Sequence, residues 1–269
     1  MKMRYLNNWA IELSDIDISK ATTQIAHHIA NLTLEHMVVV IRNQNLTPEQ
    51  QVNFCSKIGK FQHTDTDRGK DLSVYDGILR VTGKKNERGE EGLFGHTSAL
   101  DWHANQASNY ERKPLIWLYG VEGTKGSRTS WINNIESYNA LSDDIKEKIK
   151  DTQITLGYKK GSYSNSKFFK EHHHTDRPFN LVHTNDAGKK GLYFPYLQVF
   201  GGLNDELFDT LKNHILKDEF RYDHDWQDGD IVLSEQWLSI HKRWSFEDME
   251  KRILHRIAFD YSNLTLHKL

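Results

Sequence analysis

The segment 237–256 contains the residues whose chemistry is easiest to interpret. His241 precedes Arg252 by eleven residues, and Arg252 begins the run Arg-Ile-Leu-His-Arg-Ile-Ala-Phe-Asp-Tyr. The aliphatic and aromatic residues of this run predict a buried strand. Imidazole is a common ligand of transition metals, and a fixed guanidinium binds carboxylates. A metal ligand followed by a fixed cation suggests an anionic cosubstrate that chelates the metal.

A second candidate metal ligand is His103, within Leu-Asp-Trp-His-Ala-Asn-Gln at residues 100–106. Residues i and i+2 of a strand point to the same face, so His103 and Asn105 can face one metal from the end of a strand. Taken alone the pair is a weak signal, because His-x-Asn is frequent by chance. Asp101 lies on the same face of an extended segment, but only a bulge would turn it toward that metal.

Composition limits the class of protein before any motif is weighed. The 269 residues are 37% hydrophobic, enough for a substantial core in a single domain spanning 1–269. A net charge of -2 with scattered lysines argues against a nucleic-acid surface. The single cysteine, Cys55, is consistent with a reducing cytoplasm. Neither a long apolar run nor the apolar core of a signal peptide occurs, so we expect a cytoplasmic protein without a membrane partner.

The N-terminal part predicts a scaffold without catalytic residues. Apolar positions in 19–35 predict an amphipathic helix, and the β-branched run 37–41 predicts a buried strand. Thr47 and Gln50 have the pattern of a capping box at the start of a second helix, 48–58. We expect these elements to pack on the outside of a sheet.

Two stretches, 61–98 and 158–190, are predicted to be mobile loops near the mouth of a site. The first contains a strand-like piece at 78–82 and the very hydrophilic segment 83–92, which is either a lid or an ordinary exposed insertion. The second contains Glu171-His-His-His-Thr-Asp176. We interpret this cluster as polar loop residues, because consecutive histidines in a strand point to opposite faces.

Several candidate residues occur in the order found in one enzyme family. They are His103-x-Asn105, Gly126-Ser-Arg-Thr129-Ser-Trp131, His241, and Arg252 and Arg256 within Arg-Ile-Leu-His-Arg. The segments 191–196, 204–216 (a helix) and 220–233 have similar counterparts. In these features the chain resembles the taurine dioxygenase and clavaminate synthase group of iron(II)/2-oxoglutarate oxygenases. The resemblance covers nearly the whole chain and is strongest from about 191 to 261.

The resemblance implies an α/β chain with a mainly β core, folded as a double-stranded β-helix (jelly roll) with flanking helices. It implies iron(II) held by His103 and His241 as the catalytic centre, with 2-oxoglutarate as cosubstrate and O2 as the second reactant. Arg252 matches the arginine that pairs with the distal carboxylate of 2-oxoglutarate. Thr129 matches the residue whose hydroxyl supports that carboxylate, and Arg256 matches a second arginine near the cosubstrate.

Asn105 is the main departure from the family pattern, which has Asp or Glu two residues after the first histidine. A carboxamide is neutral and therefore a poorer ligand for a hard cation. In one interpretation Asn105 or a water ligates iron weakly and oxygenation persists. In a second, chloride takes the place of the carboxylate, as in the family's halogenases, which have Ala or Gly there. In a third, the protein binds a ligand without turnover.

Trp237 is a second departure, because the family commonly has an Asn-Arg pair just before the second histidine. We interpret Trp237 as a candidate wall of the substrate pocket and Trp244 as a packing residue. Retention of Arg252 and Thr129 favours an enzyme, since a decayed site has no need of a cosubstrate anchor. We expect hydroxylation of an aliphatic carbon of a small polar metabolite, such as an amino acid, with release of succinate and CO2. Oligomeric state and pathway stay open.

Overall fold

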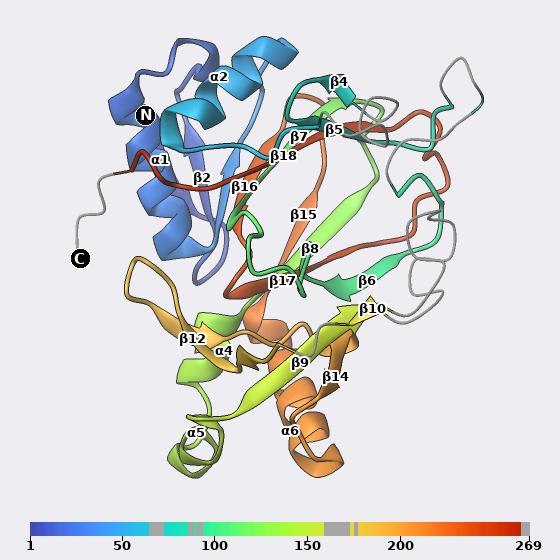
Figure 1. Ribbon diagram of the computed structural model, residues 1–269. Helices are drawn as coiled ribbons and strands as arrows, with labels where there is room; N and C mark the ends of the chain where they lie inside the picture. The colour runs from blue at the N-terminus through green and yellow to red at the C-terminus, as the bar shows by residue number, and fades with distance from the viewer. Residues whose placement is uncertain (65–72, 86–88, 90–93, 159–172, 175–176, 265–269) are drawn as a thin grey trace.

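Two β-sheets form the core of the computed structural model, which describes residues 1–64, 73–85, 89, 94–158, 173–174 and 177–264 (Figure 1). Within these residues the larger sheet has eight strands: β1 (Lys2–Tyr5), β2 (Ile11–Ser14), β3 (Val38–Ile41), β16 (Ile231–Glu235), β7 (Leu115–Glu122), β18 (Ile253–Phe259), β5 (Ile78–Val81) and β4 (Ser73–Tyr75), in that spatial order. The smaller sheet contains β15 (Arg221–Asp225), β8 (Arg128–Asn133), β17 (Ser239–Arg243) and β6 (Leu100–His103).

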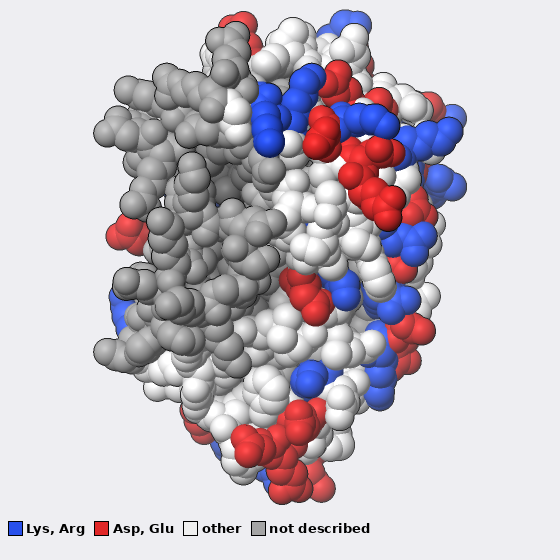
Figure 2. Space-filling view, turned by 90° about the vertical axis from the view of Figure 1, so that its right-hand side faces the viewer, with Lys and Arg blue, Asp and Glu red and all other residues white. Residues whose placement is uncertain are grey.

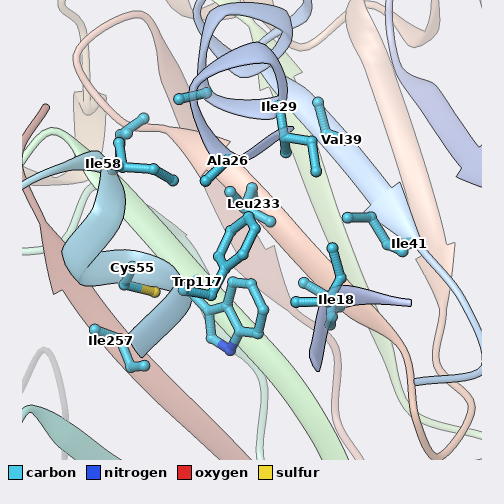
Figure 3. Packing of buried hydrophobic residues seen from close by; sticks show 14 of the residues in the cluster. Ile18, Ala26, Ile29, Val39, Ile41, Cys55, Ile58, Trp117, Leu233 and Ile257 are labelled. Atoms are coloured by element: carbon cyan, nitrogen blue, oxygen red, sulfur yellow. The ribbon is translucent and has the colours of Figure 1, made fainter. Parts of the chain in front are cut away.

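Strand β3 is buried on both of its faces. Val39 and Ile41 pack with the outer helices, as Figure 3 shows, whereas Val38 and Val40 belong to the cluster between the two sheets. Because successive side chains of a strand alternate between faces, a strand covered on both sides needs a continuous apolar run. The predicted buried strand at 37–41 is therefore confirmed, one residue shorter than expected.

Helices α1 (Thr23–His36) and α2 (Pro48–Ile58) form an outer layer against the larger sheet (Figure 1). The capping box of α2 is present, with the side chains of Thr47 and Gln50 each accepting from the backbone of the other. The first helix begins later than predicted, because 18–20 form the 3-10 turn η1 (Ile18–Lys20) and the Thr22 hydroxyl caps α1. The two helices pack outside the sheet as predicted, but the strand of this part, β3, lies within the sheet between β2 and β16. The absence of catalytic residues from this part stays a prediction.

A third layer lies at one end of the two sheets, at the bottom of Figure 1. Its strands are β9 (Gln153–Tyr158), β10 (His173–His174), β11 (Phe179–Asn180), β12 (Val182–Thr184), β13 (Lys190–Leu192) and β14 (Val199–Gly201). Its helices are α4 (Asn134–Asn139), α5 (Asp143–Ile149), α6 (Asp205–Ile215), η2 (Tyr196–Gln198) and η3 (Asp218–Phe220). The predicted helix 204–216 is α6, capped by the Asn204 side chain.

Much of the two predicted loops lies outside the described residues, including 65–72, 86–88, 90–93 and 159–172. The side chains of 171–176 are also outside them, so the interpretation of the histidine cluster stays a prediction, as does the single domain over 1–269. Within 61–98, the predicted strand is β5, which pairs with β4 and β18. Among the described residues, no helix is both long enough and apolar enough to cross a membrane.

Candidate active site

A cavity lies between the two sheets and contains six of the residues that the sequence singles out. Its described lining comes from β5, β7 and β18 of the larger sheet, from β6, β8 and β17 of the smaller sheet, and from residues next to these strands. The predicted residues that line it are His103, Asn105, Thr129, His241, Arg252 and Arg256. Residues up to 153 positions apart in sequence therefore meet in one place.

Strand alternation explains how β18 supplies this cavity. Arg252, just before the strand, and Arg256 face the cavity, four residues apart and hence on the same face. His255 points the other way, to the Gln51 side chain of α2, and Ile257 joins the core beneath the helices. The predicted strand at the C-terminal motif is confirmed as β18, and it separates residues that face the cavity from residues that face the core.

We call His103, Asn105 and His241 the imidazole end of the cavity. His103 and His241 are cross-strand partners on β6 and β17, and their ring centroids are 4.2 Å apart. His103 Nδ1 lies 2.6 Å from the Asp101 carbonyl oxygen. A carbonyl only accepts, so Nδ1 is the protonated nitrogen and the lone pair of the neutral ring is on Nε2. This tautomer is the one that can ligate a metal through Nε2.

Both histidines are neutral at pH 7. Burial lowers the pKa of His103 to about 4. Burial, assisted by the neighbouring His103 and Arg256, lowers the pKa of His241 well below its ordinary value. Neutral imidazole is the form that binds metals, so this end needs no deprotonation at neutral pH before a cation can bind.

Asn105 lies in the turn that follows β6, with its Nδ2 3.4 Å from His241 Nε2. An amide nitrogen only donates, so the His241 nitrogen accepts in this contact. The turn is fixed by Gln198 of η2, whose side chain bonds both the backbone N–H (2.8 Å) and the carbonyl (3.1 Å) of Ala104. The Asp101 carboxylate instead pairs with Lys242 at 3.1 Å on the exposed side of the strand.

We call Thr129, Arg252 and the supporting Trp226 the arginine end. Arg252 is only 1% exposed, and no ion pair within the described part of the chain includes it. Burial lowers its pKa to about 9, so it stays charged at neutral pH. A buried cation without a carboxylate partner is unfavourable in the free protein. This end is therefore suited to an anionic ligand.

Trp226 determines how Thr129 can bond. The Trp226 indole Nε1 donates to Thr129 Oγ1 at 2.9 Å, and both side chains are buried. Because that oxygen already accepts from the indole, the threonine hydroxyl proton is left to donate to another group. Trp226 reaches this position because β15 pairs with β8, and His224 on β15 lies opposite Thr129.

Arg243 is a lining residue that sequence reasoning missed. Its guanidinium donates to the carbonyls of Phe94, His96 and Ser98, and so holds residues 94–98 against the cavity. It follows His241 by two residues, so strand alternation could have placed it on the same face. Trp226 and Gln198 were missed too, and no local signal marks them, because their contacts depend on pairing between distant segments.

The predicted substrate-wall residue Trp237 is not among the described lining residues. Its ring stacks on His183, with ring centroids 4.7 Å apart, and the Arg112 guanidinium carbon lies 3.9 Å from the ring centroid. Trp244 is partly exposed, and its indole donates to Ser130 Oγ at 2.7 Å. The substrate role of Trp237 stays a prediction.

The charge in the cavity differs from that on the face shown in Figure 2. On the face in Figure 2, acidic and basic side chains are interspersed over the described residues. In the cavity, the charged residues among the described lining are all arginines: Arg243, Arg252 and Arg256. The arginines suit an anion, and the neutral imidazoles suit a metal. Their presence in one cavity indicates a site for an anion together with a metal.

Comparison with known proteins identifies the family. The model of the family described as Taurine catabolism dioxygenase TauD, TfdA family matches residues 2–258. The chain belongs to this family. It is 26% identical over 257 residues to the (S)-phenoxypropionate/alpha-ketoglutarate-dioxygenase of Sphingobium herbicidovorans, covering 86% of this chain and 85% of the relative. It is 24% identical over 274 residues to the alpha-ketoglutarate-dependent 2,4-dichlorophenoxyacetate dioxygenase of Cupriavidus pinatubonensis, covering 92% and 93%.

Solved structures show the same fold as this TauD/TfdA-family chain. The crystal structure of AAD-2 in complex with Mn(II) and N-oxalylglycine has a TM-score of 0.79 at 21% identity, covering 98% of this chain and 99% of that one. A taurine dioxygenase from Burkholderia xenovorans has a TM-score of 0.76 at 18% identity, covering 96% and 90%. The predicted jelly-roll fold is confirmed.

Family membership also confirms the predicted class. The chain is an iron(II)- and 2-oxoglutarate-dependent dioxygenase, an oxidoreductase with a small-molecule substrate and O2. The described residues fit this pair of ligands. Two neutral imidazoles suit the metal, and the buried Arg252 with the Thr129 hydroxyl suits a carboxylate. At the position where the family pattern has a carboxylate, this chain has the amide of Asn105.

Proposed function

We propose that this dioxygenase hydroxylates an aliphatic carbon of a small polar metabolite that carries a carboxylate, with release of succinate and CO2. The observation that carries the proposal is the meeting of the imidazole end and the arginine end in one cavity between the sheets. Iron(II) held there would supply oxygen activation for attack on an unactivated C–H bond, with 2-oxoglutarate as the co-reductant.

The roles of the residues follow from their donor chemistry. His103 and His241 would hold the metal through Nε2, and Asn105 would be a weak neutral ligand or leave its place to water. Arg252 would bind the far carboxylate of 2-oxoglutarate bidentately, while the hydroxyl of Thr129 donates to the same group. The Trp226 contact supports this role, because it occupies the lone-pair side of that hydroxyl.

Arg256 would lie beside the cosubstrate as a second cation near the metal, as the family pattern suggests. Its influence on both histidines supports this placement, because it lowers the pKa of each. Arg243 would exclude water by holding the carbonyls of residues 94–98 over the cavity.

The lining favours a substrate with an apolar body, because Phe94 and Leu100 contribute apolar surface. A carboxylate on that substrate is suggested by two relatives that are named for aryloxyalkanoic acids. Amino acids, the substrate class predicted from the sequence, carry the same carboxylate with an added ammonium. We take the enzyme to act in the cytoplasm on such a metabolite.

The test is a screen for succinate release with anaerobically reconstituted protein and O2 added last. Small carboxylic acids, amino acids and aryloxyalkanoates would each be offered, with Arg252→Met as the matched variant that lacks the anchor. We expect substrate-dependent succinate from at least one small acid and none from the variant. Turnover only with a macromolecular substrate contradicts the proposal.

Asn105 favours two alternative functions that the same screen separates. A halogenase-like outcome would give a chlorinated product whose yield depends on added chloride. A binding protein without turnover would form a complex with 2-oxoglutarate and iron(II) but release no succinate with any acid. In that case we expect Asn105→Asp to restore succinate release.

A further inference from the structure

The imidazole end contains no anionic donor among the described residues. The amide of Asn105 occupies the sequence position of the family carboxylate, and no Asp or Glu occurs in the described lining of the cavity. No cluster of three or more His, Cys, Asp or Glu side chains suited to a metal exists in the part of the chain that the structure describes. A cation entering this end alone meets only neutral ligands.

The surroundings of this end further disfavour a cation that enters alone. Arg252 is buried in the same cavity without an ion pair to any described residue, and Arg243 and Arg256 also line it. Like charges in a cavity of low dielectric repel strongly, because water screens them little. Binding of a free divalent cation therefore adds positive charge to a cavity that already contains the buried Arg252, which forms no ion pair with any described residue.

Asn105 adds a specific competitor for the metal. Its Nδ2 lies 3.4 Å from His241 Nε2, so the amide N–H points to the nitrogen that a metal would need. A metal at His241 must displace this donor and turn the carboxamide. The contact is weak at this distance, but like the positive charge of the arginines it disfavours binding of a metal that enters alone.

A bound dicarboxylate changes each of these conditions. One carboxylate would neutralise Arg252, and the other end would bring an anionic oxygen to the imidazole end. We propose that 2-oxoglutarate supplies the anionic donor that Asn105 lacks, so that divalent metal and cosubstrate bind to this chain as a coupled pair, each weakly by itself. This inference rests on the anchor role of Arg252 in the proposed function. Because coupling is reciprocal, the metal must raise the affinity for 2-oxoglutarate by the same factor.

The experiment measures binding of Mn(II) to the metal-free protein by the electron paramagnetic resonance signal of free Mn(II), with and without saturating 2-oxoglutarate. Mn(II) replaces iron so that no turnover interferes. The comparison variant is Asn105→Asp, which restores a carboxylate, and Arg252→Met lacks the anchor. Buffer samples without protein give the Mn(II) bound by 2-oxoglutarate in solution.

We expect 2-oxoglutarate to tighten Mn(II) binding by about 100-fold or more in the native chain, within the usual upper range of coupling between sites. Asn105→Asp should bind Mn(II) alone at least about tenfold more tightly than the native chain, and its coupling factor should be smaller. Arg252→Met should lose the coupling. Equal Mn(II) affinity of the native chain and Asn105→Asp, or equal coupling in both, overturns the proposal.

A second measurement keeps the test valid if a variant fails to fold. Calorimetric titration of the native chain with 2-oxoglutarate, with and without Mn(II), must return the same factor, and an affinity unchanged by Mn(II) overturns the coupling. The outcome is separate from the proposed function. Coupled binding without succinate release refutes only the function, whereas succinate release with uncoupled binding refutes only this inference.

Discussion

The arginine end and the imidazole end of the cavity depart from the family pattern to different degrees. At the arginine end, the expected residues Thr129 and Arg252 are both present, and an indole fixes the threonine hydroxyl. At the imidazole end, both histidines are present, but the third position is Asn105. Thr129 lies on β8 and Arg252 lies directly before β18, whereas Asn105 lies in a turn beyond β6.

This difference separates the support of the proposed cosubstrate anchor from the support of the proposed metal ligand. Thr129 faces the cavity from β8, and Arg252 faces it from the position just before β18. Asn105 follows the strand, and its position depends on the side chain of Gln198. Asn105 can therefore change without disturbing strand pairing, whereas Thr129 lies in a strand that is paired on both sides.

The largest effect is expected from removing the anchor. Arg252→Met should weaken 2-oxoglutarate binding by roughly 100-fold, because the ligand carboxylate loses a buried charged partner. The same variant should raise the free energy of unfolding of the ligand-free protein by about 1 kcal/mol or more, since a buried cation without an ion pair is removed. Calorimetric titration and denaturant unfolding measure the two effects.

Arg128→Met is the matched control for the arginine end. Arg128 is on the same strand as Thr129, but it is exposed and pairs with Asp225 at 2.7 Å. We expect this substitution to leave 2-oxoglutarate affinity unchanged. A similar loss of affinity in both variants would show that Arg252 acts through general charge and not as an anchor.

The next largest effect is expected on the pH dependence of stability, through His103 at the imidazole end. Burial lowers the pKa of His103 to about 4, below the value of about 6.5 in an unfolded chain. Between these two values the unfolded state binds more protons, so stability is full above pH 6.5 and falls as the pH drops toward 4. His103→Gln should make this decline shallower by up to about 1.4 kcal/mol per pH unit.

His255→Gln separates proton binding from metal binding in this experiment. Burial also lowers the pKa of His255 to about 4, but this residue contacts Gln51 and lies outside the cavity. Denaturant unfolding between pH 4.5 and 7 should show a shallower decline in both variants, and only His103→Gln should lose Mn(II) binding. An unchanged slope in both would contradict neutral buried histidines.

A smaller effect is expected from the indole that fixes Thr129. Trp226→Phe keeps a ring in the core but removes the N–H that bonds Thr129 Oγ1. Loss of one buried hydrogen bond costs about 1 kcal/mol, so 2-oxoglutarate binding should weaken by about fivefold. Trp117→Phe is the control, because Trp117 is equally buried but packs beneath the helices. Equal effects of both substitutions would indicate lost packing and not lost positioning.

The smallest effect is expected at Trp237. Its ring packs on His183 and Arg112, and Trp237 is not among the described lining residues, so Trp237→Phe should change 2-oxoglutarate and Mn(II) affinities by less than about twofold. Once a substrate is known, its KM provides the decisive measurement. A change in KM of tenfold or more would restore the substrate-wall prediction.

The sequence predicted the parts of the molecule that depend on local pattern. Thr47 and Gln50 marked the start of α2, and the run of β-branched residues marked β3. The ordered set from His103 to Arg256 was recognised through family resemblance, and the cavity contains all of its singled-out members.

The contacts that the sequence did not predict depend on pairing between distant segments. Trp226 meets Thr129 only because β15 lies beside β8, and Gln198 meets Ala104 across 94 residues. The orientation of Trp237 was unpredictable for the same reason, since Arg112 and His183 lie far from it in sequence. Arg243 is different, because it follows His241 by two residues in a strand, and this spacing predicts that both side chains lie on the same face.

The two hydrogen bonds between Gln198 and Ala104 connect the turn that contains Asn105 to the third layer and not to the jelly roll alone. Gln198 belongs to η2, which is followed directly by β14 in that layer. A chimera that exchanged this layer for that of a relative would also exchange the support of the turn that presents Asn105. Redesign of the third layer would therefore also change the support of Asn105 in this protein.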